Sequence, residues 1–218
     1  NQLQNLFNTI FVNMPVRAVL IFYRIVKIFS DKYHLLFYHK LTNSMNLTYV
    51  NSEIVFDASS FAPASRAFRF LTKEPETLFW IDNHLLNGEC FYDIGANTGV
   101  YSLYACKKGA QVVAFEPESL SYSVLNKNIY FNKFDRKIIA LNIALYDRDV
   151  ISKLNLSSFK PGKSSHNFHE ELDPNHQKFK PGFTQNVIGM RLDTLIRYYN
   201  LPFPNHIKID VDGNEHKI

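Results

Sequence analysis

Residues 91–99, FYDIGANTG, decide the fold that we predict for this chain of 218 residues. The apolar and aromatic residues around Asp93 favour a buried strand, while Gly95 and Gly99 favour a tight turn where the backbone can approach a ligand closely. Apolar residues at helical spacing follow, so the turn lies between the carboxyl end of a strand and the amino end of a helix. In α/β sheets this is the place where cofactors bind.

A second buried strand is predicted at residues 111–115, QVVAF, and it ends in Glu116 and Pro117. Glu116 comes 21 residues after Gly95, the separation that one helix and one strand require. In dinucleotide-binding and adenosyl-binding folds, an acid at this position accepts hydrogen bonds from the two ribose hydroxyls. Pro117 cannot continue a strand ladder, so it marks the end of the strand.

Two further core strands are predicted at residues 138–145, IIALNIAL, and 206–211, HIKIDV. Residues 89–145 alternate strand, helix, strand, helix and strand, which predicts an α/β fold with a parallel sheet and helices on both faces. In a sheet ordered 3-2-1-4, the strand of Asp210 lies beside the strand of Asp93. Outside this pattern we expect strands at 152–156 and 186–190, a helix start at 72–76, a helix capped by Asp193, and a loop-like segment at 159–182.

Five motifs in order, DIGANTG, FEP, NIAL, RLDTL and IKIDVDGNE, resemble the FkbM family of S-adenosylmethionine-dependent methyltransferases. The resemblance covers residues 74–218 and implies a Rossmann-like class I methyltransferase fold with S-adenosylmethionine as cofactor. It implies a sheet of seven strands, of which this sequence supplies the first four. We therefore expect a methyltransferase domain at 74–218 that is incomplete at its C-terminus, and a basic helical extension with short strands at 1–73.

The resemblance also implies the cofactor-binding residues. Asp93 would hold the glycine loop or the ammonium group of the ligand, and Glu116 would accept from the ribose hydroxyls. The loop residues that would cradle the amino-acid portion of the cofactor are Gly95, Ala96, Asn97 and Gly99. Asn142 or Ala144, near the end of the third strand, would line the adenine, although either could simply be a packing residue.

Asp210 is the candidate catalytic residue, with Glu215 as the alternative. Its strand ends at the switch point of the sheet, so a carboxylate there would face the reactive end of the cofactor. Methyl transfer to a hydroxyl requires that the acceptor oxygen be positioned and its proton removed. Asp210 would orient the acceptor or act as the general base. In the alternative interpretation, Asp210 and Asp212 only cap a turn.

The predicted function is O-methylation of a sugar hydroxyl on a glycan or glycolipid, and this acceptor class comes from the resemblance. A nicotinamide-dependent oxidoreductase would share the strand, the turn and the ribose acid, but DIGANTG lacks the G-x-G-x-x-G spacing. A catalytically inactive binding or scaffold module with the same sheet is the second alternative.

Charge and hydropathy limit the partners. The net charge is +4, residues 1–50 are modestly basic and the charges of the remainder cancel, which argues against nucleic acid as a partner. Residues 9–29 are apolar but interrupted by charges, so we expect no membrane span there; they form either an interfacial helix on an anionic membrane or a helix packed on protein. Cys90 and Cys106 suit buried positions, and a cytoplasmic location is the default.

The loop-like segment at 159–182 is rich in histidine and charge. A metal cluster could be read from His166, His169, His176, Glu170, Glu171 and Asp173. The spacing is weak for a metal, so we expect a solvated lid and no metal site. The lysines around the lid could contact an anionic acceptor.

Overall fold

The structure is a computed structural model that describes residues 48–51, 53–163, 166–168, 180–211 and 213–218. The predicted helix at 9–29 lies outside the described residues, so its membrane contact and the cytoplasmic location stay predictions. Within the described ranges, no helix is long and apolar enough to cross a membrane. Other predicted features outside the described residues are His169, Glu170, Glu171, Asp173, His176 and Asp212.

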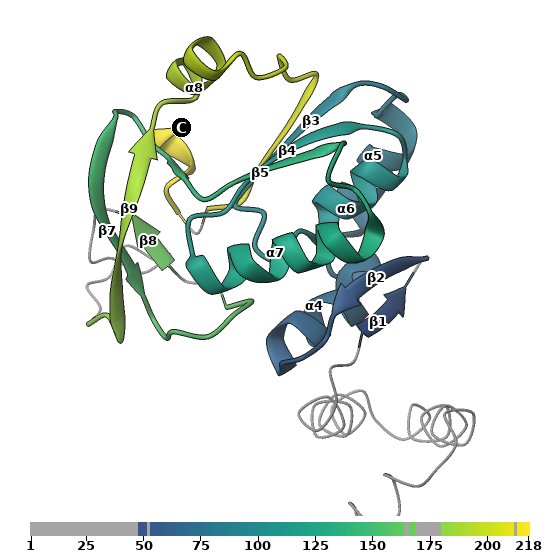
Figure 1. The fold of residues 1–218 in the computed structure, drawn as a ribbon, viewed down its shortest axis with the longest axis horizontal. Helices are drawn as coiled ribbons and strands as arrows, with labels where there is room; N and C mark the ends of the chain where they lie inside the picture. Colours follow the sequence, from purple (N-terminus) through teal and green to yellow (C-terminus); the bar gives the residue numbers. More distant parts are fainter. Residues whose placement is uncertain (1–47, 52, 164–165, 169–179, 212) are drawn as a thin grey trace, which may run out of the picture. The chain divides into compact units, whose positions relative to one another are not determined.

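The core of the fold is a four-stranded parallel sheet with the order β10-β3-β4-β5 (Figure 1). Its strands are β3 (Cys90–Ile94), β4 (Gln111–Phe115), β5 (Ile138–Leu141) and β10 (His206–Ile209). Asp93 lies opposite Lys208 in the register, and the ladder continues to Asp210, whose N–H donates to the Ile94 carbonyl at 2.9 Å. The predicted strand order, with Asp210 beside Asp93, is confirmed.

Helices cover both faces of this sheet, so the predicted fold class is confirmed. On one face, Phe91 and Val112 pack with residues of α5 (Pro75–His84), α6 (Val100–Lys107) and α7 (Ser119–Asn132). On the other face, Tyr92 and Phe115 pack with Leu195 of α8 (Leu192–Tyr199). Alternate residues of the central strands β3 and β4 thus enter two separate hydrophobic clusters, as the pleat of a doubly covered sheet requires.

Residues 48–51 and 53–73 pack against the sheet domain. Strands β1 (Thr48–Asn51) and β2 (Ile54–Asp57) form an antiparallel pair that precedes α4 (Phe61–Lys73). In α7, the Asn132 amide bonds both backbone groups of Val55, at 2.9 and 2.7 Å. In α4, Phe70 packs on the rings of Phe56 and Tyr104 at 5.6 and 5.9 Å. Leu47–Ile218 accordingly forms one compact unit.

The predicted single strand at 138–145 is wrong, because the chain leaves the core sheet at Asn142. The Asn142 amide donates to the carbonyl groups of Glu116 and Pro117, at 2.7 and 3.0 Å, instead of continuing the ladder. The chain then enters a second sheet with the order β6-β9-β7-β8. Its strands are β6 (Ala144–Leu145), β7 (Val150–Leu156), β8 (His166–Phe168) and β9 (Phe183–Met190).

The predicted cap of α8 is also wrong. The N-cap residue is Arg191, and Asp193 lies within the first turn, where its carboxylate pairs with the Arg191 guanidinium at 3.3 Å. An acid in the first turn still complements the helix dipole. The helix was therefore predicted correctly, but its start was placed two residues too late.

Candidate active site

A cavity of about 390 Å³ opens at the carboxyl ends of β3, β4 and β10. This volume is within the usual range of small-molecule sites. Five predicted residues line it, namely Gly95, Asn97, Glu116, Ala144 and Asp210. A second, much smaller pocket of about 10 Å³, which we call the extension, shares Gly95, Asn97 and Asp210 with the cavity and is also lined by Asp93 and Ala96. Neither lining includes Gly99, Asn142 or Glu215.

The glycine loop is held close to the end of β10. Gly95 has φ +80°, and a Cβ atom there would lie 1.9 Å from the carbonyl oxygen of Asp210. The N–H groups of Gly95 and Ala96 both donate to the Phe115 carbonyl, at 3.0 and 2.9 Å. Gly99, also at φ +80°, is the N-cap of α6. The loop therefore needs glycine at residue 95 for steric reasons as well as for its backbone angle.

Asp93 is almost fully buried at the start of this loop and is only half paired. Its Oδ2 atom accepts from the Ser102 hydroxyl at 2.6 Å, while its buried Oδ1 atom has no hydrogen-bond partner among the described residues. Burial raises the pKa of Asp93, and the charge of Lys208 opposes that shift. An unpaired buried oxygen is costly, so a cationic donor arriving in the extension would be stabilised there.

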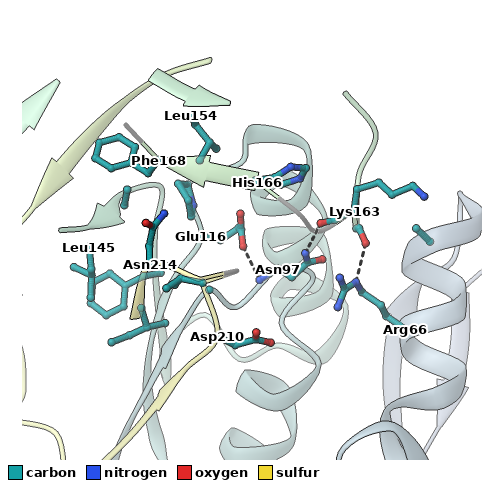
Figure 2. Close-up of a pocket in the computed structure, with 18 of the residues that line it drawn as sticks. Arg66, Asn97, Glu116, Leu145, Leu154, Lys163, His166, Phe168, Asp210 and Asn214 are labelled. Carbon is teal, nitrogen blue, oxygen red and sulfur yellow. Dashed lines mark hydrogen bonds between the residues drawn. The ribbon is translucent and has the colours of Figure 1, made fainter. Parts of the chain in front are cut away.

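Glu116 is held rigidly at the end of β4. One carboxyl oxygen accepts from the Asn97 backbone N–H at 2.7 Å (Figure 2). The other accepts from the Glu118 backbone N–H at 2.8 Å. The side chain is 5% exposed, and this burial raises the pKa of Glu116 to about 8. Glu118 caps α7 by accepting from the N–H groups of Leu120 and Ser121, which fixes the turn that carries Glu116.

The burial of Glu116 predicts that ligand binding releases a proton. If ribose hydroxyls donate to the ionised carboxylate, as predicted from the sequence, a bound adenosyl ligand would lower the pKa of Glu116 from about 8. Below pH 8 the affinity for S-adenosylhomocysteine should therefore rise with pH and then level off. Calorimetry at pH 7 in buffers of different ionisation enthalpy measures the released proton.

The matched variant for this prediction is Glu116→Gln. It should bind S-adenosylhomocysteine about 10-fold to 100-fold more weakly, since a charge-assisted hydrogen bond is replaced by a neutral one. Its affinity should show no rise between pH 6 and pH 8. Equal pH dependence in the two proteins would show that Glu116 does not contact the ribose.

Asp210 and Glu215, the two candidates for catalysis, differ in their surroundings. The Asp210 side chain is half exposed at the cavity, with the ammonium of Lys208 3.4 Å from its Oδ2 atom. The Glu215 carboxylate instead accepts from the N–H groups of Val211 and Gly213, at 3.1 and 3.2 Å, and closes the turn after β10. The structure therefore brings Asp210 to the site and leaves Glu215 in a structural position.

Asn142 is placed differently from the sequence expectation, whereas Ala144 meets the cavity. The side-chain amide of Asn142 donates to the backbone carbonyl of Glu116, directly after β4, and Asn142 does not line the cavity. Ala144, two residues further and in the second sheet, is buried and lines the cavity with its neighbours Leu145 and Tyr146.

A group of lining residues was missed by the sequence analysis. One wall comes from α4 and carries Arg66, Arg69 and Lys73, and another comes from the chain around β8. The three basic residues of α4 are separated by three and four positions in the sequence, and this spacing could have predicted that they lie on one face of a helix. The β8 wall, which includes Lys163, His166 and Phe168, belongs to the predicted lid segment at 159–182, but no local signal showed which of its residues would line the cavity.

The chain near Lys163 ties the glycine loop to α4. The Asn97 amide donates to the Lys163 carbonyl at 2.8 Å, and the Arg66 guanidinium donates to the Gly162 carbonyl at 2.8 Å (Figure 2). The Gly162 N–H donates to the Ser121 hydroxyl at 3.0 Å. This part of the predicted lid is thus anchored at the cavity on three sides. Among the described residues, no group of three His, Cys, Asp or Glu side chains could hold a metal ion.

Comparison with known proteins identifies the family. A family model described as the methyltransferase FkbM domain matches residues 93–218, which is more than half of the chain. The chain belongs to the FkbM methyltransferase family. The predicted methyltransferase family, with S-adenosylmethionine as its cofactor, is therefore confirmed. No curated protein sequence matched this FkbM chain.

Several solved structures match part of this chain. The C-terminal domain of precorrin-6Y C5,15-methyltransferase from Rhodobacter capsulatus is 26% identical, with a TM-score of 0.31, over 34% of this chain and 40% of its own. TYW2 from P. horikoshii, in complex with MeSAdo, is 24% identical with a TM-score of 0.36. The match covers 44% of this chain and 35% of the TYW2 chain. A SAM-dependent methyltransferase from Agrobacterium tumefaciens is 16% identical with a TM-score of 0.36. The match covers 44% of this chain and 31% of that methyltransferase chain. The FkbM chain thus matches less than half the length of each.

Proposed function

We propose that this FkbM protein transfers a methyl group from S-adenosylmethionine to a hydroxyl oxygen, with a sugar hydroxyl of a glycan or glycolipid as the acceptor. The observation that carries the proposal is the position of Asp210. This carboxylate lines both the cavity that contains Glu116 and the extension that contains Asp93. A potential base therefore lies between the two groups suited to the ends of the cofactor.

The residues present fit S-adenosylmethionine. The buried carboxyl of Glu116 would hold the ribose hydroxyls, and the unpaired Oδ1 atom of Asp93 would accept from the ammonium group. Gly95 keeps the loop free of a side chain at the point where it meets β10. When bound, the cofactor supplies a methyl group carried on a sulfonium sulfur.

The chain itself would position the acceptor and take its proton. Asp210 accepts a hydrogen bond from the acceptor hydroxyl and receives its proton as the oxygen attacks. The Lys208 ammonium lies 3.4 Å from the Oδ2 atom of Asp210. Apolar lining residues such as Phe115, Leu145 and Leu154 displace water from the cavity. The choice of a sugar as acceptor rests on the family resemblance.

The test is a pair of titrations of the full chain followed by an activity measurement. We expect S-adenosylhomocysteine to bind at micromolar strength and a nicotinamide dinucleotide to bind at least 100-fold more weakly, as estimated from the loss of fitted polar contacts. Labelled methyl groups should then pass to a glycan mixture but not to the same glycans after chemical methylation of their hydroxyls.

Each other outcome points to a different function. Stronger binding of the dinucleotide would favour the oxidoreductase alternative. Binding of S-adenosylhomocysteine without transfer to any hydroxyl, amine or thiol acceptor would favour a binding module. Transfer to methylated and unmethylated glycans alike would exclude a hydroxyl as the acceptor group.

A further inference from the structure

The basic residues of α4 form a continuous face on the cavity, which we call the α4 basic stripe and define as Arg66, Arg69 and Lys73. All three line the cavity, and they follow one another at intervals of three and four residues along the helix. At 1.5 Å per residue, the stripe extends about 10 Å along the helix axis. The rotation of α4 is fixed by Phe70, which packs on Phe56 and Tyr104 on the buried side.

The charges around the cavity are unbalanced in favour of cations. The side chains with a fixed positive charge in the lining are the α4 basic stripe and Lys163, whereas the acids are Glu116 and Asp210. Burial keeps much of Glu116 protonated near neutral pH. The wall formed by α4 therefore presents a positive potential to whatever enters the cavity.

The three residues of the stripe differ in their present contacts. The Arg66 guanidinium is bonded to the Gly162 carbonyl at 2.8 Å, and the Lys73 ammonium is bonded to Glu74 at 2.6 Å. Within the described part of the chain, the exposed Arg69 guanidinium makes no hydrogen bond or ion pair, unlike Arg148 and Arg191, which each pair with a neighbouring aspartate. Arg69 thus retains its full fork of donors at the cavity.

We propose that the α4 basic stripe binds an anionic group, a phosphate or a carboxylate, on the methyl acceptor, with Arg69 as its main ligand. This inference rests on the proposed function, because it describes the acceptor of the same site. The carboxylate of the cofactor is the other source of such an anion, and it would lie near the extension that Arg66 and Lys73 also line. A single carboxylate engages one guanidinium fork, so it cannot occupy a stripe about 10 Å long. Arg69, which lines the cavity but not the extension, is left for the acceptor.

The experiment titrates the full chain with glucose 6-phosphate, glucuronate and uncharged glucose, with and without saturating S-adenosylhomocysteine. At least one of the two charged sugars should bind more tightly than glucose. The Arg69→Gln variant should bind that sugar about tenfold more weakly, the loss typical of one charge-assisted hydrogen bond. The same variant should bind S-adenosylhomocysteine within about twofold of the wild type. The matched control is Arg197→Gln, which removes an exposed arginine from α8 and should leave all these affinities unchanged.

The outcomes separate this inference from the proposed function. If neither charged sugar binds better than glucose, or if Arg69→Gln binds them like the wild type, the inference is wrong. If Arg69→Gln loses affinity for S-adenosylhomocysteine but not for 5′-methylthioadenosine, which lacks the carboxylate, then the stripe serves the cofactor instead. If the wild type does not bind S-adenosylhomocysteine at all, the proposed function fails, while the titrations without it still test the stripe.

Discussion

A Gly95→Ala variant is expected to lose cofactor binding and a large part of the stability of the domain. The new Cβ atom would lie 1.9 Å from the Asp210 carbonyl oxygen, a backbone atom that cannot rotate away. Either the loop or the end of β10 must move, and both line the cavity. Backbone strain at positive φ costs about 1–2 kcal/mol and overpacking about 1–3 kcal/mol, so the free energy of unfolding should fall by about 2–5 kcal/mol.

Gly88→Ala is the matched control for this variant. Gly88 also has a positive φ, +89°, but a Cβ atom there would meet nothing within 4 Å. It should lose only the strain of about 1–2 kcal/mol and bind S-adenosylhomocysteine normally. Denaturant unfolding and calorimetric titration of the three proteins measure both effects. Equal losses in the two variants would mean that the contact between the loop and β10 has no role in the site.

Asp210→Asn should reduce kcat by about 10²-fold to 10⁴-fold, the usual contribution of a general base. The amide can still orient the acceptor but cannot take its proton. The Kd for S-adenosylhomocysteine should stay within about threefold of the wild type, because Glu116 and Asp93, not Asp210, are assigned to the cofactor. Steady-state kinetics and calorimetric titration measure these two quantities.

Asp193→Asn provides the comparison for Asp210→Asn. Asp193 is an exposed residue of α8, and its carboxylate pairs with the Arg191 guanidinium. This variant should retain the activity of the wild type. If Asp210→Asn also retained it while binding S-adenosylhomocysteine normally, Asp210 would be a turn residue and the base would have to be sought elsewhere.

The core of the fold could be predicted because its signals are local. The apolar run before Asp93, the two glycines and the acid that ends β4 each act within a few residues of the chain. Combined with the strand order 3-2-1-4 that is typical of such folds, they predicted that the strand of Asp210 lies beside the strand of Asp93, as the structure shows. The position of Glu116 at the cavity follows from the same pattern, since parallel strands end at one edge of a sheet.

The second sheet could not be predicted, because long-range pairing determines it. In the run 138–145, apolar residues flank Asn142 on both sides, yet the chain leaves the core sheet there, where the Asn142 side-chain amide donates to the Glu116 and Pro117 carbonyls. Strand β7 pairs with β9 through contacts such as Ile151 opposite Ile188. The α4 wall was missed for a related reason, since its residues are distant in sequence from the glycine loop.

The second sheet lies between β5 and β10 along the chain, and this arrangement has an evolutionary consequence (Figure 1). The cavity walls at Leu154, His166 and Phe168 come from this insertion, whereas Gly95 and Glu116 come from the core sheet. Mutations in the insertion can therefore alter one side of the cavity while the core strands keep their register. We expect related proteins to diverge in what they modify mainly by changing residues 144–190, with the glycine loop and the acid after β4 inherited unchanged.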